Sequence, residues 1–421
     1  MKPHSVLSNW RGGIMDKTLA NDLFFSKEAA EYLNITTQRL NTLVKEGKIE
    51  PLKKTPSGTI FHISELNKRR EEQRIFLKTG QGGEKGMFQL DTKDKIEALN
   101  FATLMNALEI TEQRLDPLFS EFSERTDVTI PLNDNSVTKK YIDFFKVNRE
   151  RLLKEFDMAE RAFSTLHKTD EIIKRGSQDY PPLLAETEQA PRFLYIRGKK
   201  SLLFEKRTVA LVGSRKASEK AKDNTKRLTV KLGDNGITIV SGLAKGIDVT
   251  AHRAALENGY NTIAVIGTNL NQYYPAENKE VQLMIEKKGL VVSQFSPASK
   301  TQRWFFPLRN GVMSGLSLAT VIMEAGETSG ALKQADFALK QGREVLIPKS
   351  ALAIESISWP SKYLKKGAKL VTYPKDVLEI LAESNIFRVD QTIQQQSFDD
   401  ILNRSVEPSK TKAKWISQVS E

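Results

Sequence analysis

The residues with the clearest chemical potential lie between Ser241 and Leu256, where the sequence reads SGLAKGIDVTAHRAAL. This stretch follows Thr238-Ile239-Val240, which is typical of the end of a buried strand, and it runs on into a helical pattern. Glycines between a strand and a helix allow another group to come close to the backbone, and Lys245 adds a positive charge. The pattern therefore predicts contact with an anion.

Asp248 and His252 in the same stretch have a spacing that could also serve catalysis. Residues four apart lie on one face of a helix, so that these two side chains can reach each other. We favour a hydrogen bond between them that fixes the loop. Acid–base catalysis by the pair is the alternative.

The elements that must position these residues alternate along the chain from Thr208 onward. Short apolar segments are separated by stretches with helical periodicity, and they read TVALV, TIV, TIAVI, LVVS, ATVIM and EVLIP. This alternation predicts an α/β fold with a Rossmann-like, doubly wound, mainly parallel sheet. In such a sheet the loops after the strands gather along one edge, where ligands bind.

Those loops contain the unusual residues of the chain. They are residues 213–218 (GSRKAS), 241–248 (SGLAKGID), 267–275 (GTNLNQYYP), 293–297 (SQFSP), 324–330 (EAGETSG) and 348–350 (PKS). Three of them place Gly and Ser just before a helix, where free amides and the helix dipole favour a phosphate. Arg215, Lys245 and Arg309 can add full charges. No loop reads GxxxxGK[ST] or GxGxxG, which disfavours ATP hydrolysis and classical NAD binding.

Charge is concentrated in the same segment. The whole chain has a net charge of +12, whereas residues 172–377 alone hold 32 Lys/Arg against 18 Asp/Glu, a difference of +14. Such an excess suggests a polyanion partner, and a solvated basic surface is the alternative. With no cysteine and four scattered histidines, we expect neither disulfides nor a metal site or cofactor. No apolar run is long enough to span a bilayer, and the composition fits the cytoplasm.

The N-terminal pattern from Leu23 to Glu72 predicts two short helices followed by a hairpin and a further helix start. It resembles the winged helix-turn-helix of excisionase and MerR-type proteins. The resemblance implies contact with duplex DNA, and a protein-contact role is the alternative. The implied DNA-contacting residues are Gln38, Arg39, Asn41, Thr42 and Lys45 in the second helix and Lys53 and Lys54 in the wing.

The chain is expected to divide into five parts. These are a flexible leader (1–20), the winged helix-turn-helix (21–78), a helical domain (87–171), the Rossmann-like core (172–378) and a C-terminal tail (379–421).

Several motifs of the core, in order, resemble one family. They read YPPLLAETEQAPRFLYIRG (180–198), VALVGSRKAS, IVSGLAKGIDVTAHRAAL, TIAVIGTNLNQYYPAEN, FPLRN (306–310), EAGETSGAL, ALKQGREVLIP and KKGAKLVTYPKDVL. About half of the chain is similar to the DNA processing protein DprA, or Smf, family. The resemblance implies a core that binds single-stranded DNA without base specificity, forms a homodimer and, in transformable bacteria, helps to load the recombinase RecA. The family is not known as an enzyme.

Carried over to this sequence, the resemblance implies a strand-binding pocket at the loops. Its DNA- and phosphate-binding residues would be Gly213, Ser214, Arg215, Ser241, Gly242, Lys245, Gly246, Phe306, Arg309, Asn310, Ser329 and Gly330. Stacking on Phe306, Trp304 or Tyr273 would add to the phosphate contacts. The sequence departs from the family pattern at Gln294, where Glu is usual, and the helical N-terminal module of the family is expected to be replaced. RecA is therefore not assumed as a partner.

Two other functions are left open. The altered loops and the added N-terminal segment would fit a regulatory or antitoxin-like subunit that controls a neighbouring effector protein in a phage-defence or mobile-element module. A nucleotide phosphoribohydrolase is less favoured, because EAGETSGAL lacks the PGGxGTxxE motif of those enzymes.

Overall fold

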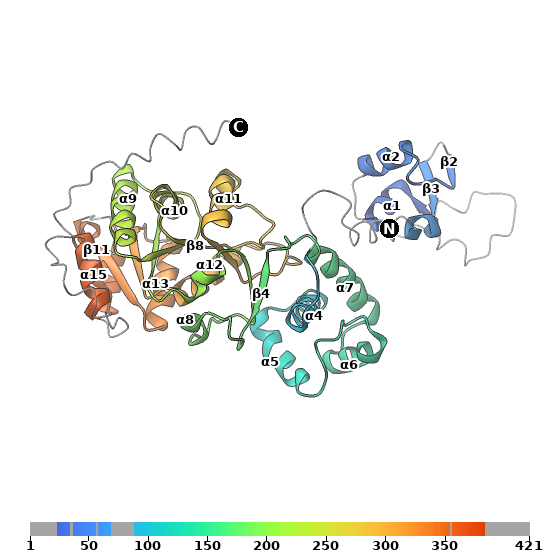
Figure 1. Cartoon of the computed structure of the whole chain (residues 1–421), viewed down its shortest axis with the longest axis horizontal. Helices are drawn as coiled ribbons and strands as arrows, with labels where there is room; N and C mark the ends of the chain where they lie inside the picture. The colour runs from blue at the N-terminus through green and yellow to red at the C-terminus, as the bar shows by residue number, and fades with distance from the viewer. Residues whose placement is uncertain (1–22, 34–36, 56–57, 69–87, 354–355, 384–421) are drawn as a thin grey trace. The chain divides into compact units, whose positions relative to one another are not determined.

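The computed structural model describes residues 23–33, 37–55, 58–68, 88–353 and 356–383 (Figure 1). The chain separates into two compact units, Met1–Gln89 and Leu90–Glu421, which are described one at a time.

The N-terminal unit is a three-stranded antiparallel sheet with short helices. Its strands, in the order β1-β3-β2, and its helices are β1 (Leu23–Phe25), β2 (Lys53–Thr55), β3 (Gly58–His62), α1 (Ser26–Tyr32) and α2 (Thr37–Lys45). Residues 63–68 are also helical. A small apolar core holds the unit together, formed by Ala29, Ala30, Leu33, Leu40, Leu43, Ile49, Phe61 and Leu66. α2 is followed by Gly47 at φ +65°, a conformation that suits glycine at a helix end.

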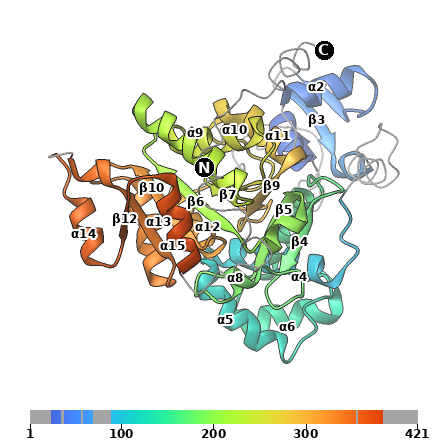
Figure 2. The same ribbon diagram turned by 60° about the vertical axis from the view of Figure 1, so that its left-hand side comes forward.

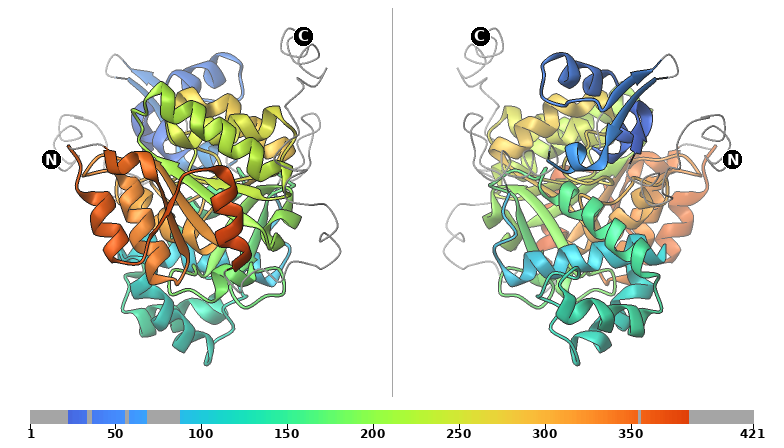
Figure 3. Two further views of the ribbon diagram at one scale, coloured as in Figure 1. Left: turned by 90° about the vertical axis from the view of Figure 1, so that its left-hand side faces the viewer. Right: turned by 90° about the vertical axis from the view of Figure 1, so that its right-hand side faces the viewer.

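The second unit begins with four helices. They are α4 (Lys93–Leu108), α5 (Glu112–Ser123), α6 (Asn135–Phe145) and α7 (Arg149–Phe163). Side chains of Thr92, Asp134 and Asn148 accept hydrogen bonds from the first turns of α4, α6 and α7 and so fix where these helices start. Both views of Figure 3 show this helical group at one end of the unit.

A nine-stranded sheet forms the centre of the second unit. Its order is β12-β11-β10-β6-β7-β8-β9-β5-β4. The strands are β4 (Glu171–Lys174), β5 (Phe193–Gly198), β6 (Thr208–Gly213), β7 (Thr238–Ser241), β8 (Thr262–Val265), β9 (Leu290–Ser293), β10 (Ala319–Glu324), β11 (Glu344–Pro348) and β12 (Lys369–Val371). All pairs from β12 to β9 are parallel, whereas β5 and β4 are antiparallel additions at one end.

Helices cover both faces of this sheet (Figure 2). One face is covered by α9 (Glu219–Asp234), α10 (Ile247–Glu257) and α15 (Pro374–Glu383), and the other by α8 (Pro182–Ala185), α12 (Phe305–Gly315), α13 (Gly330–Lys340) and α14 (Trp359–Lys365). α11 (Lys279–Lys288) packs against β9 and β5. The 3-10 segments are Lys200–Phe204, Ala276–Asn278 and Lys349–Ala353. Alternate residues of β6 point to opposite faces, so Val209 and Leu211 join one core and Ala210 and Val212 the other.

The predicted α/β fold with a doubly wound, mainly parallel sheet is confirmed. From β6 the chain runs through β7 to β9 on one side and then returns to β10 on the other side. The strand order therefore reverses between β6 and β10. A crevice at such a reversal, beyond the carboxyl ends of the strands, is where open α/β sheets bind ligands.

The four-helix group is fixed to the sheet by buried charges. Glu97 of α4 is 1% exposed and accepts hydrogen bonds from Arg192 (2.9 Å to Nη2) and from Lys174 of β4. Asp116 of α5 bonds both Arg192 (2.8 Å) and Arg175 (2.5 Å). Charges removed from water in this way stay stable only with their partners in place, so the helices and the sheet form one body.

Candidate functional site at the carboxyl edge of the sheet

The loop after β6 presents one free cation at the strand-order reversal. Gly213 has no room for a side chain, because a Cβ atom would lie 2.8 Å from the carbonyl oxygen of Glu324 and 2.5 Å from Ile247. The amide of Ser214 donates to that same carbonyl oxygen at 2.7 Å, which ties the loop to β10. Arg215 is exposed, and within the described residues its guanidinium has no ion-pair partner.

The loop after β7 has a buried half and an exposed half. Ser241 is fully buried and donates its hydroxyl to the carbonyl of Leu211 at 2.6 Å, so it supports the loop from beneath. Lys245 is half-exposed and pairs with Glu277 at 2.5 Å. Gly246 then starts α10 at φ +75° and ψ −121°, which is open to glycine and strained for other residues.

Arg309 is buried beneath this loop rather than exposed beside it. Its side chain is 6% exposed, and its guanidinium donates to the carbonyl oxygens of Gly242 (2.6 Å) and Val265. Burial lowers the pKa of Arg309 to about 10, although the nearby Asp248 carboxylate opposes that shift. Arg309 thus joins the ends of β7 and β8 and leaves a positive charge under the loop. These hydrogen bonds position the loop after β7.

The predicted hydrogen bond between Asp248 and His252 is wrong. His252 is fully buried, and its Nδ1 pairs with the hydroxyl of Thr262 at 2.7 Å, while Asp248 accepts from the amide of Ala244 at 3.4 Å. Burial lowers the pKa of His252 to about 3. Burial also raises the pKa of Asp248, and the charge of Arg309 limits that rise. A neutral histidine inside the core cannot exchange protons with a ligand. Asp248 and His252 therefore have structural roles, each through its own partner.

Aromatic rings lie beside the exposed cations. Phe306 packs over Gly267, and its ring centre is 4.9 Å from that of Tyr274, which is 50% exposed. Tyr273, the predicted stacking residue, is instead half-buried, and Lys279 lies 5.4 Å from its ring centre. Tyr274 is therefore the more exposed of the two adjacent tyrosines. Alternation along an extended segment could have suggested that only one of them faces outward.

The loop after β10 contributes the start of α13. Ser329 caps that helix by accepting from the amide of Ala331 at 3.3 Å. Asn310 is buried and donates to the carbonyl of Gly330 at 3.2 Å. Gly330 itself is exposed, with open space where a side chain would extend. Of the predicted residues, Arg215, Lys245, Phe306 and Gly330 thus line the accessible side of the loops, whereas Ser241, Arg309 and Asn310 support them.

Two carboxylates that sequence reasoning missed occupy helix starts at the same edge. Glu324 accepts from the amide (3.0 Å) and hydroxyl (2.6 Å) of Ser218, the residue that caps α9. Glu327 accepts from the amide of Trp359 at 3.0 Å, and the indole of that residue donates to the carbonyl of Ala325 at 2.8 Å. Residues 358–364 (SWPSKYL) therefore pack against the loop after β10.

In the N-terminal unit, the predicted contact residues lie on α2 and β2. Gln38, Asn41 and Lys45 are exposed on α2, as are Lys53 and Lys54 on β2. Thr42 is half-buried and donates its hydroxyl to the carbonyl of Gln38 at 3.1 Å. Arg39 belongs to α2, and its side chain lies outside the described residues.

Over the described ranges, no helix is long and apolar enough to cross a membrane. In the same ranges no three His, Asp or Glu side chains gather as a metal ion would require.

Known proteins match the chain over its second unit. The chain is 39% identical over 238 residues to the DNA processing protein DprA of Streptococcus pneumoniae. This match covers 56% of this chain and 79% of that protein. The corresponding protein of Bacillus subtilis is 35% identical over 214 residues, covering 51% of this chain and 72% of that one.

The solved structure of the S. pneumoniae protein corrects one expectation. Its similarity to this chain has a TM-score of 0.56 at 31% identity and covers 68% of this chain and 97% of the solved chain. Nearly all of that relative therefore has a counterpart here. The expected replacement of the family's helical N-terminal module is wrong.

A family model described as DNA recombination-mediator protein A matches residues 171–382, half of the chain. The match spans the sheet and includes all of the loops described above. Together with the two relatives, it shows that this chain belongs to the DNA recombination-mediator protein A family, also called DprA or Smf.

Proposed function

We propose that this protein binds single-stranded DNA at the carboxyl edge of its sheet and acts in DNA processing and recombination rather than as an enzyme. The observation that carries the proposal is that two exposed cations, Arg215 and Lys245, and the open backbone of Gly330 follow the neighbouring strands β6, β7 and β10. The buried charge of Arg309 lies beneath them. Phosphates bind where cations and exposed amides converge.

Single strands are favoured over duplex DNA because of the exposed rings. Tyr274 and Phe306 present aromatic surface next to the cations, and unpaired bases stack on such rings, whereas paired bases are already stacked on each other. The name of the S. pneumoniae relative, a DNA processing protein, agrees with this class of ligand.

Replacing Arg215 by alanine is expected to weaken binding of single strands of every sequence by about tenfold, the effect of losing one charge-assisted contact. The slope of log affinity against log salt concentration should also become less steep by about one, which corresponds to one released counterion. The measurement is fluorescence anisotropy of the full chain with labelled single-stranded and duplex oligonucleotides of mixed sequence, across a salt series.

The matched control is Arg227→Ala on α9, which removes an exposed arginine in the middle of that helix, away from the loops. Equal losses for the two variants would reject the assignment of Arg215. Absence of single-strand binding by the unmodified chain would reject the proposed function itself.

Glu277 is expected to oppose binding, because it holds Lys245 in an ion pair at 2.5 Å and repels phosphate. Both side chains are about half-exposed, so the pair is weak. Glu277→Gln should raise the affinity for single strands about two- to fivefold at low salt, with a smaller gain as salt screens the charge. Glu257→Gln, at the end of α10, controls for net charge. An equal gain in both variants would show that Glu277 has no specific role.

For the N-terminal unit, we propose contact with duplex DNA through α2 and the β2–β3 hairpin. Gln38, Asn41 and Lys45 form an exposed polar face on α2, and Lys54 is exposed on β2. A polar and basic helix face beside a basic hairpin fits a groove flanked by phosphates. Binding of the duplex oligonucleotide that falls in Lys45→Ala while single-strand binding is unchanged would support this role. Loss of neither would point to a protein partner.

A further inference from the structure

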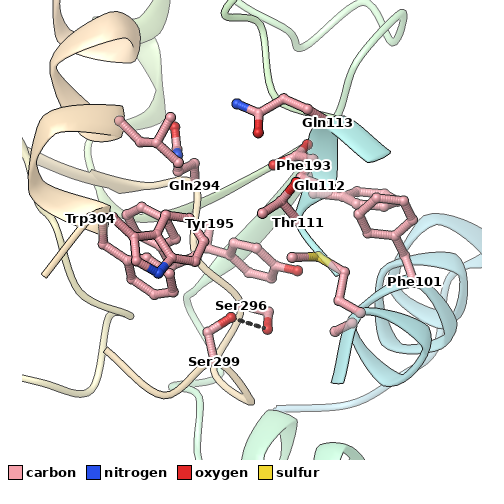
Figure 4. Close-up of a pocket in the computed structure, with 15 residues that line it drawn as sticks. Phe101, Thr111, Glu112, Gln113, Phe193, Tyr195, Gln294, Ser296, Ser299 and Trp304 are labelled. Atoms are coloured by element: carbon pink, nitrogen blue, oxygen red, sulfur yellow. Dashed lines mark hydrogen bonds between the residues drawn. The ribbon is translucent and has the colours of Figure 1, made fainter. Parts of the chain in front are cut away.

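A cavity lies between the four-helix group and the sheet, where residues 294–296 of the loop after β9 form part of its lining. It has a volume of about 50 Å³, and Figure 4 shows it between α4 and α5 on one side and the segment before α12 on the other. One water occupies about 10–15 Å³ by a comparable measure, so the cavity has room for several atoms beyond the protein. Exposed Trp304 and Gln113 belong to its lining, which therefore reaches the surface.

The walls of this cavity are mostly aromatic. The rings that line it are Phe101, Phe193, Tyr195, Phe295, Trp304 and Phe305. Phe295 and Phe305 are stacked with ring centres 3.8 Å apart, and Trp304 meets Phe305 edge-on at 4.6 Å. Flat, rigid walls of this kind fit a flat ring.

Polar groups inside the cavity lack protein partners. Tyr195 is 3% exposed, and Figure 4 shows its hydroxyl directed into the cavity, where no described residue forms a hydrogen bond with it. Gln294 and Thr111 also line the cavity, and within the described residues the amide of Gln294 and the hydroxyl of Thr111, which precedes α5 without capping it, form no hydrogen bond. Polar groups that face a cavity without protein partners are available to bond a ligand, so they favour a ligand with hydrogen-bonding atoms.

The residues that line the cavity disfavour apolar molecules and anions as ligands. An apolar molecule would leave the hydroxyl of Tyr195 unpaired. An anion would meet the carboxyl group of Glu112, and no Lys or Arg side chain lines the cavity. Glu112 accepts a hydrogen bond from the amide of Arg192 through one oxygen, and the hydrogen bonds of the described residues leave its other oxygen available. A flat heteroaromatic ring with donors and acceptors on its edge satisfies all of these conditions.

We infer that this cavity receives one nucleobase, with Tyr195 and Gln294 bonding its edge and the aromatic walls stacking on its faces. The inference rests on the proposed function for the source of the base. Trp304 lines the cavity, and Phe306, two residues further along, lies at the proposed strand site. A strand held by its phosphates at Arg215 and Lys245 can therefore turn one base into the cavity.

The test distinguishes binding through the bases from binding through the phosphates. The full chain is titrated with an oligothymidylate and with a strand of the same length whose sugars lack bases, so both carry the same charge. We expect the base-bearing strand to bind about tenfold more tightly. The double variant Tyr195→Phe/Gln294→Ala should reduce that ratio at least threefold and leave the affinity for the abasic strand unchanged.

The Tyr195→Phe substitution and its control are expected to leave the fold intact. Tyr195→Phe keeps the ring that packs against Phe163 and removes a hydroxyl without a protein partner, so its melting temperature should not fall. Tyr260→Phe, whose hydroxyl bonds Asp234 near the surface, is the matched control and should not change the ratio. A ratio that is one in the unmodified chain, or unchanged in the double variant, overturns the inference while the proposed function stands.

A second arm identifies the source of the base. If neither strand binds, the proposed function fails, and the full chain is titrated with thymidine and adenosine monophosphates while tryptophan fluorescence is followed. Binding that is lost in the Tyr195→Phe/Gln294→Ala variant would assign the cavity to free nucleotides. Absence of binding would overturn the inference.

Discussion

Glu97→Ala is expected to lower the free energy of unfolding by about 3–5 kcal/mol, the largest stability effect of any single change considered for this protein. Glu97 is 1% exposed and accepts hydrogen bonds from the Nε (3.2 Å) and Nη2 (2.9 Å) of Arg192 as well as from Lys174. Its removal leaves the guanidinium of Arg192, whose side chain is 9% exposed, with part of its charge uncompensated. Urea denaturation of the full chain measures the change.

Two control variants test whether an uncompensated buried charge causes the loss of stability in Glu97→Ala. Glu219→Ala removes one partner of the exposed pair Lys222–Glu219 and should change stability by less than about 1 kcal/mol. The double change Glu97→Met/Arg192→Leu removes both charges and should recover part of the loss, because the rings of Phe101 and Phe119 already surround Arg192. If the single and double variants were equally destabilised, lost packing and not an unpaired charge would explain the effect.

Gly246→Ala is expected to reduce single-strand affinity by more than tenfold and stability by about 2–3 kcal/mol. The residue has φ +75°, and a Cβ atom there would overlap the carbonyl oxygen of Ser214. The loop after β6 would have to move, and Arg215 would move with it. Anisotropy and thermal denaturation of the same preparation measure both effects.

Gly330→Ala is the matched control for this change. It places a methyl group in open space at the first position of α13, where alanine is a good helix former, so stability should stay the same or rise. Affinity should nevertheless fall if phosphate approaches the backbone there. Equal stability loss in the two variants would contradict the conformational argument for Gly246.

The sheet and its order of helices could be predicted because buried parallel strands appear as continuous apolar runs between helical patterns. Neither β4, which reads EIIK, nor β5 is among the predicted strands, which begin at Thr208. Four residues with two buried isoleucines do not distinguish a period of 2 from one of 3.6. β5 pairs with β9, which is distant in sequence, and β4 pairs in turn with β5.

For the site, sequence predicted which loops meet but not which side chains face outward. In the sequence, Arg309 and Arg215 have the same charge. In the structure, Arg309 is buried and donates to the carbonyl of Gly242, whereas Arg215 is exposed. The partner of His252 on α10 is Thr262 on β8, and the packing of α10 against β8 sets that pairing. The cavity at Tyr195 depends on how α4 and α5 pack on the sheet, which local patterns do not encode.

The carboxylate of Glu324 at the start of α9 has a consequence for selectivity among the anions of a cell. Two amides at this helix start already have acceptors, since the amide of Ser218 donates to Glu324 and the amide of Ala221 donates to the hydroxyl of Ser218. A single phosphate would therefore compete with the carboxylate of Glu324 at this helix start. Under the proposed function, a polymer of phosphates gains from several weak contacts along one edge, so the expected preference is for a strand over a single phosphate.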